Sequence, residues 1–461
     1  MTELGAPTAA VDQDDALAEL RRSVAGPVLG PEDVEVVAEL AAYNLGPEHA
    51  PVAVVGATGA EDVAAAVRWA AARGIRIGVF ATGHSDVAQR GTLVVTTRRM
   101  DRVDVDPVTR RATVGAGAKW ARLVEAAAPH GLAGLNGSTT DVGVVGYVVG
   151  GGVGPFTRTY GYASDRVRRV QLVTGDATIR EVTAESDPEL FDVVLGGKDA
   201  AGIVTEVEME LIELPSLYGG GLIYEAADIP AVLHAWRAWA PTLPEETTTS
   251  VAILRAPDIE AVPPPLRGRT VAHLRVAHLG SAEEGRELLA PMRAVATPMM
   301  DMIDVMPYAA IDAIHMDPVD PMPAWADGRF LTGLDEDLVD AVLAMAGPDQ
   351  QLPLFLVELR HIAGAIERGT RGVGTREARW LAGVVGPFPP ELRGVVPAVA
   401  EQLLDALAPW TAPQTSLNWI NPAVAAARPE LVWTPATRAR IDAVCRRVGS
   451  AGVFGGPGLG L

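Results

Sequence analysis

The sequence predicts an α+β protein with more than one domain. The chain has 461 residues, whereas a domain usually holds about 100 to 200. Its first part, up to about Pro215, alternates helical and strand-like segments. After Pro215 prolines become frequent and methionines cluster, but strand and helix patterns continue. This change is typical of a second domain in which helices cover a sheet.

Each element follows from a local signal. In the first part, helices are expected where apolar residues recur at helical spacing, as Val63, Val67 and Ala71 do before Gly74. These helices span residues 61–73, 120–130 and 188–195. Strands are expected over residues 51–55, 75–80, 93–97, 111–114, 167–174, 178–182 and 203–214. In the second part, strands are expected over 270–279 and 354–359, and helices over 229–240 and 338–345. The tail, 416–461, is expected to return to a strand, a helix over 434–447 and a Gly-rich end.

Composition excludes several classes of protein. With 38 Lys plus Arg against 58 Asp plus Glu, the formal net charge is −20, which argues against nucleic acid and anionic membrane surfaces as partners. The single cysteine, Cys445, excludes an internal disulfide and a zinc site built on paired cysteines, and no metal is expected. The acidic N-terminus lacks a secretory pattern, and no run of about 18 apolar residues occurs. We therefore expect a cytoplasmic protein.

Two motifs indicate chemistry. A glycine-dense run extends from Gly137 to Gly154; its backbone N–H groups are suited to bind phosphate, although tight turns in a packed sheet would also explain it. A dinucleotide fingerprint fits poorly, because the glycines continue through apolar residues. The second motif is a turn after a strand that contains Gly83 and His84. A histidine there is either structural or a nucleophile for a covalent adduct.

Together these motifs resemble one family. The order is an Ala-rich helix, a strand, Gly83-His84-Ser85, GxGxxW at 115–120, the glycine run, YGYASD at 160–165 and GIVT at 202–205. This ordered set is similar to FAD-linked oxidases of the vanillyl-alcohol-oxidase or p-cresol-methylhydroxylase (PCMH) fold, in the berberine-bridge-enzyme-like branch. The resemblance is clear over 51–214 and returns at 357–365 and 416–454.

The resemblance implies a PCMH-type FAD domain of two α/β subdomains, completed by the C-terminal tail, and an α+β substrate domain with an antiparallel sheet. The expected parts are an N-terminal extension (1–45), the FAD domain (46–214), the substrate domain (215–412) and the returning tail (413–461). His84 matches the histidine that bonds to the flavin 8α carbon. The other residues that the resemblance places around FAD are Phe80, Ala81, Thr82, Gly83, Ser85, Gly137, Ser138, Thr139, Asp141, Val142, Gly143, Gly146, Tyr147, Gly150, Gly151, Gly152, Val204 and Asn418, the last on a C-terminal strand.

Three departures from the family pattern matter. Thr139 stands where some members carry a cysteine that attaches FAD a second time, so the attachment here is expected through His84 alone. Phe80, Ala81 and Thr82 replace the usual Arg and extra Gly before the histidine, which puts the phosphate contacts in question. No tyrosine follows Tyr308, so the tyrosine base of several relatives is absent or replaced.

The candidate catalytic residues are therefore Glu358, His361, Glu367 and Tyr147. Strand alternation puts Glu358 and Arg360 on one face and His361 on the other; a solvated ion pair and a core histidine are the plainer interpretations. Arg360, Arg376, Trp419 and His315 are the candidate substrate-pocket residues.

The main functional hypothesis is an FAD-dependent oxidase of a small-molecule alcohol, amine or ring C–H, with O2 as electron acceptor and a role in secondary metabolism. The alternatives are a flavin dehydrogenase that uses another acceptor, a redox-neutral rearrangement catalyst and a binding or structural protein. The oligomeric state stays open.

Overall fold

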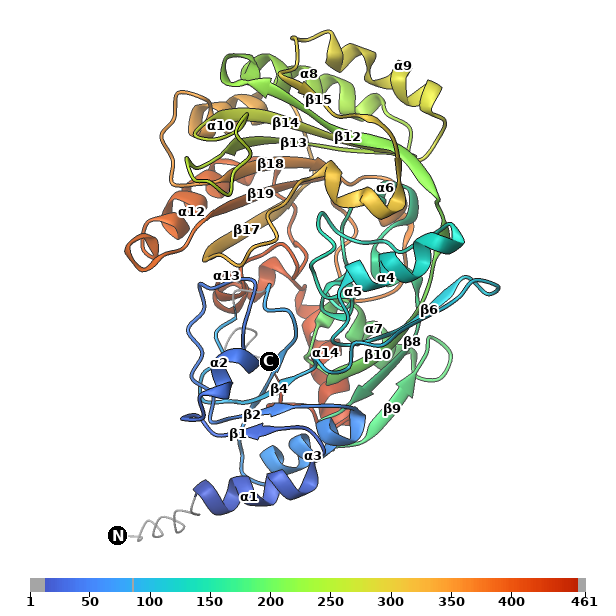
Figure 1. Ribbon diagram of the computed structural model, residues 1–461, viewed down its shortest axis with the longest axis vertical. Helices are drawn as coiled ribbons and strands as arrows, with labels where there is room; N and C mark the ends of the chain where they lie inside the picture. Colours follow the sequence, from blue (N-terminus) through green and yellow to red (C-terminus); the bar gives the residue numbers. More distant parts are fainter. Residues whose placement is uncertain (1–12, 85–86, 455–461) are drawn as a thin grey trace.

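The computed structural model describes residues 13–84 and 87–454. At one end of the molecule lies a small sheet in the order β1-β2-β4-β3 (Figure 1). Its strands are β1 (Val28–Leu29), β2 (Ala53–Gly56), β3 (Ile77–Phe80) and β4 (Leu93–Thr96). Strands β2, β4 and β3 run parallel, which requires crossover connections. Helix α3 (Ala60–Ala71) makes the first crossover and buries the predicted apolar face, including Val63 and Val67.

The second sheet is antiparallel, in the order β5-β6-β10-β8-β9. Its strands are β5 (Val103–Asp106), β6 (Arg111–Gly115), β8 (Val167–Val173), β9 (Ile179–Val182) and β10 (Ile203–Glu210). The helices around it are α4 (Trp120–Ala127), α5 (Val144–Val148), α6 (Thr157–Tyr160) and α7 (Pro188–Gly197). The glycine run thus forms loops and the short helix α5, which packs in the same core as Trp120 and Leu172. The predicted strand over 203–214 divides at Leu211 into β10 and β11 (Ile212–Glu213), and β11 pairs with β7 (Leu132–Ala133).

A large antiparallel sheet forms the other end of the molecule, in the order β15-β12-β14-β13-β18-β19-β17, with β16 paired to β12. The strands are β12 (Ser216–Glu225), β13 (Thr247–Arg255), β14 (Thr270–His278), β15 (Met300–Asp301), β16 (Asp304–Pro307), β17 (Ala324–Leu331), β18 (Leu356–His361) and β19 (Trp380–Pro387). Its covering helices are α8 (Ile229–Trp239), α9 (Ala282–Arg293), α10 (Glu336–Ala346) and α12 (Val396–Ala406), which lie on the face turned away from the first two sheets (Figure 1). Val357 and Leu359 of β18 pack in that apolar core, so Glu358 and Arg360 occupy the opposite face.

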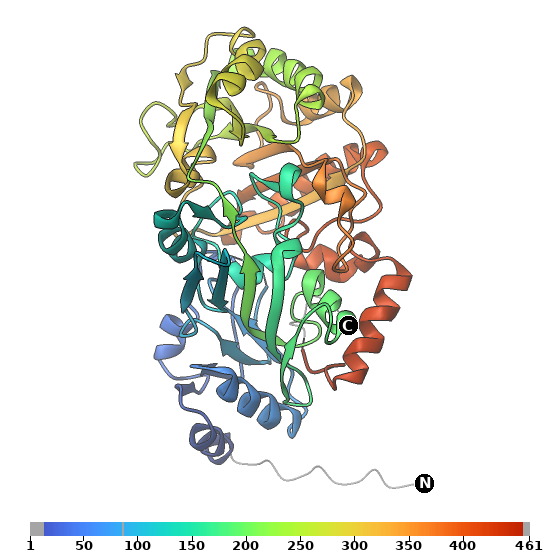
Figure 2. The ribbon, with the colours of Figure 1, turned by 90° about the vertical axis from the view of Figure 1, so that its right-hand side faces the viewer.

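The C-terminal segment returns to the first two sheets. Helices α13 (Pro422–Ala427) and α14 (Pro435–Arg447) follow the large sheet, and α14 runs along the side of the first part (Figure 2). The Ser450 hydroxyl accepts from Gly175 N–H at 2.9 Å and donates to the Ala201 carbonyl at 2.7 Å. Ile77 and Phe454 form a parallel β-bridge. The tail therefore completes the core around β3 and β10.

The strand that was expected to carry Asn418 is absent from the described structure, and this part of the prediction is wrong. Residues 417–419 form a turn. The Ser416 hydroxyl accepts from the Asn418 N–H at 3.3 Å, and its carbonyl accepts from the Trp419 N–H at 2.9 Å. A serine that bonds the backbone two residues on favours a turn over a sheet ladder.

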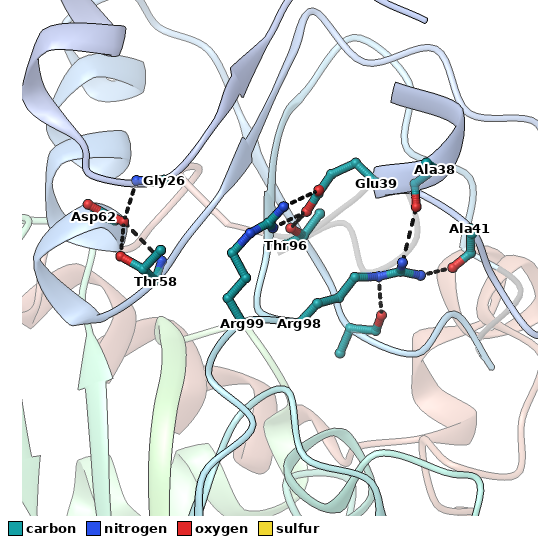
Figure 3. Close-up of polar contacts among 10 residues, drawn as sticks. Gly26, Ala38, Glu39, Ala41, Thr58, Asp62, Thr96, Arg98 and Arg99 are labelled. Atoms are coloured by element: carbon teal, nitrogen blue, oxygen red, sulfur yellow. Dashed lines mark hydrogen bonds and ion pairs between the residues drawn. The ribbon is translucent and has the colours of Figure 1, made fainter. Parts of the chain in front are cut away.

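Polar contacts join the segment after α1 (Gln13–Ser23) to α3, and α2 (Glu35–Glu39) to the segment after β4 (Figure 3). Asp62 accepts hydrogen bonds from the backbone of Gly26 and from Thr58 at 2.7 to 3.1 Å. Arg99 binds both carboxylate oxygens of Glu39 at 2.7 Å. A bidentate pair of this kind has a defined geometry as well as a favourable energy. It therefore fixes the position of α2, the helix beside the loop after β3. Within the described ranges, no helix has the length and apolarity needed to cross a membrane.

Candidate functional site

A cavity of about 250 Å³ lies between the small sheet, the glycine run and the start of β10. Its walls come from segments that are far apart in the sequence. The lining residues are Val79–His84, Val87, Gln89, Thr97, Ala116, Val142, Gly143, Val145–Tyr147, Val149, Lys198, Asp199, Gly202–Val204, Leu417, Ile420 and Pro422. Most of the wall is apolar, with a few polar groups among it, as is usual for a site that binds an organic molecule.

The loop that carries His84 is held in place from two sides. Gly83 has φ +68°, and a side chain there would overlap Ala42, so glycine is required by both conformation and space. The Arg98 guanidinium donates to the carbonyls of Ala81 and Ala38, which ties the loop to α2 (Figure 3). The backbone N–H of Tyr43 donates to the Thr82 carbonyl at 3.1 Å.

His84 is enclosed and neutral at pH 7. The Tyr43 ring stacks on its imidazole with 4.2 Å between ring centres and 8° between planes. Burial lowers the pKa of His84 to about 4, although the Asp141 carboxylate opposes this shift. Nδ1 lies 3.1 Å from the Thr82 hydroxyl, and Nε2 lies 3.6 Å from Asp141, which also pairs with Lys119. The carboxylate favours the tautomer with its proton on Nε2, in which the Nδ1 lone pair accepts from the Thr82 hydroxyl.

The glycine run shapes the opposite wall. Gly143 precedes α5 and lies against Thr82, whereas a side chain at Gly146 would meet nothing within 4 Å because this backbone faces the cavity. Gly151 and Gly152 have φ of +103° and +81°. They and Gly137 lie against the rings of Tyr162 and Tyr147.

The C-terminal segment holds Tyr147 in place through Asn418. The Tyr147 carbonyl accepts from the Asn418 amide at 2.8 Å, and Asn418 also packs directly on Gly150. The Tyr147 ring lines the cavity, and its hydroxyl is buried without a hydrogen-bond partner in the described chain. Burial raises the pKa of Tyr147, so the phenol keeps its proton at neutral pH.

At the far end of the cavity, Val204 lies beside Lys198 and Asp199. Lys198 has a positive φ of 52°, and burial lowers its pKa and raises that of Asp199. Among the other residues expected around the cofactor, eight do not line the cavity, namely Gly137, Ser138, Thr139, Asp141, Gly150, Gly151, Gly152 and Asn418. Ser85 lies outside the described residues.

The polar face of the large sheet meets the glycine run in a buried charge cluster. Glu358 accepts from Arg275 at 3.0 Å with one carboxylate oxygen, and its other oxygen lies 2.9 Å from Arg360. The Arg360 guanidinium lies over the Trp419 ring at 4.7 Å. Glu358 and Arg360 are 3% and 8% exposed, so the solvated interpretation of this strand face is excluded. Both oxygens of the candidate base Glu358 are engaged by arginines.

The remaining predicted residues lie in different surroundings. His315 is buried near Arg360 and Arg275, and burial together with these charges holds its pKa well below the usual range. His361 stacks on Trp380 at 4.1 Å in the adjoining core. Glu358, Trp419, Glu367 and Arg376 line neither this cavity nor a second, smaller one beside the charge cluster. Glu367 pairs with Arg379 at 3.5 Å and is 40% exposed. Arg376 clamps the Asp165 carboxylate at 2.6 and 3.1 Å.

Sequence reasoning missed Tyr43, Lys198 and Arg275. Arg275 and His273 interrupt the apolar strand over 270–279 with polar side chains, a pattern that signals a buried polar face. Lys198 lies in a glycine-rich stretch, which is a weaker indication of a functional residue. No local pattern marks Tyr43, because its role comes from stacking across the fold.

The comparisons with known proteins agree with this geometry. A family model described as an FAD binding domain matches residues 51–183. The chain is 29% identical over 333 residues to (R)-6-hydroxynicotine oxidase of Paenarthrobacter nicotinovorans, covering 70% of this chain and 68% of that one. It is 31% identical over 222 residues to glucooligosaccharide oxidase of Sarocladium strictum, covering 46% of this chain and 44%, less than half, of that one. The solved structure of Physcomitrella patens BBE-like 1 shares the fold, with a TM-score of 0.82 and 18% identity over 97% of this chain and 98% of that one.

The matched domain and the cavity define the protein as an FAD-linked oxidoreductase. More particularly, residues 51–183 match the FAD binding domain, the chain is similar to FAD-linked oxidases, and it shares its fold with a solved berberine-bridge-enzyme-like protein.

The residues present fit FAD. The open backbone at Gly146 gives a flat group room to approach, and the buried His84 and Tyr147 each present a polar atom without a hydrogen-bond partner in the described chain. Gly143 and Gly146 belong to this wall, and glycines let a cofactor approach the main chain closely.

Proposed function

We propose that the protein is an oxidase of a small organic molecule and acts on an alcohol, an amine or a ring C–H bond in secondary metabolism. FAD, when bound, supplies the hydride acceptor and passes the electrons to dioxygen, which gives hydrogen peroxide. The supporting observation is the position of Tyr147, which lines the large cavity near the buried charge cluster around Arg360. A substrate between them would have a polar group held and an oxidisable carbon directed at the cofactor.

Relatives support the class of substrate. The proteins to which this chain is similar are named for 6-hydroxynicotine and for glucooligosaccharides. Both are small organic molecules. Tyr147 is our proposed hydrogen-bond donor to the substrate, because its protonated hydroxyl lies beside the cavity without another partner in the described chain.

We further propose that FAD is joined covalently to His84 and to no second residue. The neutral imidazole carries an Nδ1 lone pair, which the Thr82 hydroxyl contacts, and Asp141 lies near Nε2, so the ring is suited to act as a nucleophile. The purified protein is expected to be yellow and to keep its colour after acid precipitation. His84→Ala should release all flavin on denaturation, as judged by fluorescence of the washed pellet. Flavin that stays attached in this variant would refute the linkage.

The reaction is tested by anaerobic mixing with candidate alcohols and amines, followed by air. An oxidase will bleach the flavin absorbance and recover it rapidly in air, with hydrogen peroxide formed in equal amount. Fast bleaching with slow recovery would instead favour a dehydrogenase. Turnover without oxygen consumption would favour the redox-neutral alternative, and a flavin that no candidate reduces would refute the oxidase proposal.

A further inference from the structure

A second, small cavity lies between the glycine run and the polar face of the large sheet. Its volume is about 20 Å³, which is room for about one water-sized group, such as one oxygen of a carboxylate. Its lining residues are Val153, Gly154, Pro155, Thr248, Thr249, Ser250, Arg275, Val276, Ala277, Ile314, His315, Arg360, His361 and Ile362. Both arginines of the charge cluster belong to this wall.

The wall carries an excess of positive charge. Arg275 and Arg360 share the single carboxylate of Glu358, at 3.0 and 2.9 Å, and the three side chains are 3%, 9% and 3% exposed. The histidines beside them add no positive charge, because burial holds the pKa of His315 well below its usual range and lowers that of His361 to about 2. A buried charge without a partner is costly, and an anion in contact with it removes that cost.

The partly exposed carboxylate of Asp317 does not neutralise the excess positive charge of the two arginines. Its field reaches Arg275, but among the described residues it makes no ion pair with either arginine. Three further lining residues have buried polar atoms without hydrogen-bond partners in the described chain, namely Ser250 Oγ, His315 Nδ1 and His361 Nδ1, and Arg360 Nε is a fourth. Each of these residues is less than 9% exposed. A fixed guanidinium with a hydroxyl beside it is the donor set that suits a carboxylate.

The small cavity adjoins the large one through Tyr147. The Tyr147 ring lines the large cavity, and its hydroxyl would come within 2.9 Å of a Cβ at Gly154, which lines the small one. Trp419, on which Arg360 lies, follows Asn418, whose amide bonds the Tyr147 carbonyl. A molecule anchored at Arg360 would therefore reach the cofactor cavity by passing the Tyr147 ring.

We propose that this small cavity binds the carboxylate group of an acidic substrate, between the guanidinium groups of Arg275 and Arg360, with the rest of the molecule extending past Tyr147. The proposal rests on the proposed function for the reaction itself, but the anion site is defined by binding alone. Glu358 then acts as a positioning residue that holds the two guanidinium groups apart and oriented, because each of its oxygens contacts one of them.

The test measures binding to the holoenzyme by calorimetry and by the flavin difference spectrum. The probes are acetate and benzoate, each paired with its neutral amide, acetamide or benzamide. We expect at least one acid to bind about tenfold or more tightly than its amide, because a hydrogen bond to a charged group is worth more than one to a neutral group. Equal affinity for acid and amide in both pairs would overturn the proposal, and so would an acid that binds only as weakly as chloride.

Matched variants locate the site. Arg360→Gln should remove most of the preference for the acid, and Arg360→Lys should keep part of it. The control, Arg286→Gln, removes a 56%-exposed arginine from the same domain and should change nothing. Retained flavin in each variant shows that it folds; if Arg360→Gln does not fold, Arg360→Lys and Arg275→Lys decide the matter. Undiminished acid preference in the folded variants refutes the assignment. Preferential acid binding without peroxide formation would refute the oxidase proposal and leave the anion site standing.

Discussion

His361 makes a specific contribution to the acid sensitivity of the fold. Its ring is 3% exposed and stacks on Trp380. Burial, reinforced by Arg158 and Arg379, lowers its pKa to about 2. Unfolding returns the imidazole to an ordinary pKa of about 6.5. The unfolded chain therefore binds a proton at pH 5 that the folded chain rejects, and stability falls as pH decreases from about 6.5 towards 2.

The magnitude follows from these two pKa values. At pH 5.0 an imidazole of pKa 6.5 carries about 0.97 of a proton, and one of pKa about 2 carries almost none. Unfolding at pH 5.0 should thus take up about one proton because of His361. Integrated from pH 7.5 to 5.0, this uptake amounts to a loss of about 2 kcal/mol of stability.

The variant His361→Phe keeps an aromatic ring against Trp380 and removes the titrating group. We expect its unfolding in unbuffered guanidinium at pH 5.0 to take up about one proton fewer than that of the wild type, as counted by pH-stat. The control is Trp380→Phe, which disturbs the same stack without removing the imidazole and should leave proton uptake unchanged. Equal uptake by wild type and His361→Phe would refute the reasoning.

Two further predictions concern the glycine run. Gly146→Val should lower the flavin content of the purified protein, because the new side chain enters the cofactor cavity. The measurement is the ratio of flavin to protein absorbance. The control is Gly394→Val, whose backbone also has open space around it and which should leave the flavin content unchanged. Asp312→Ala should lower the free energy of unfolding by about 2 kcal/mol in calorimetry. The reason is that Asp312 accepts hydrogen bonds from the backbone N–H of Thr140, at 2.8 Å, and from its hydroxyl. An unchanged unfolding temperature would show that these hydrogen bonds do not stabilise the fold.

Elements with a clear local period were predictable from the sequence. Alternation over 357–361 indicated a strand with Glu358 and Arg360 on one face, and β18 spans Leu356–His361. The alternation did not say which face is buried. That outcome depends on the glycine run packing against the polar face, a contact between segments about 200 residues apart in the sequence.

The contacts that complete the site arise from tertiary structure. Tyr43 stacks on His84 because Arg98 bonds both α2 and the loop after β3. Sequence periodicity does not predict this contact between distant segments. The prediction of a strand around Asn418 was wrong because the Ser416 hydroxyl competes for the backbone N–H. The resemblance of ordered motifs placed His84, Gly146 and Val204 on one cofactor, and these residues do line one cavity.

The returning tail has a consequence for how the protein is made. The strand that ends at Phe80 is bridged by Phe454, and Ser450 joins Gly175 to Ala201. During synthesis, the ribosome therefore releases the whole large sheet before the residues that close the first core emerge. Domains usually fold as units in the order of their synthesis, but here the nascent first domain must wait, partly open, for more than 200 residues. We therefore expect cofactor loading to be a late event, and a nonsense mutation between Pro215 and Ser450 to leave the flavin domain unclosed.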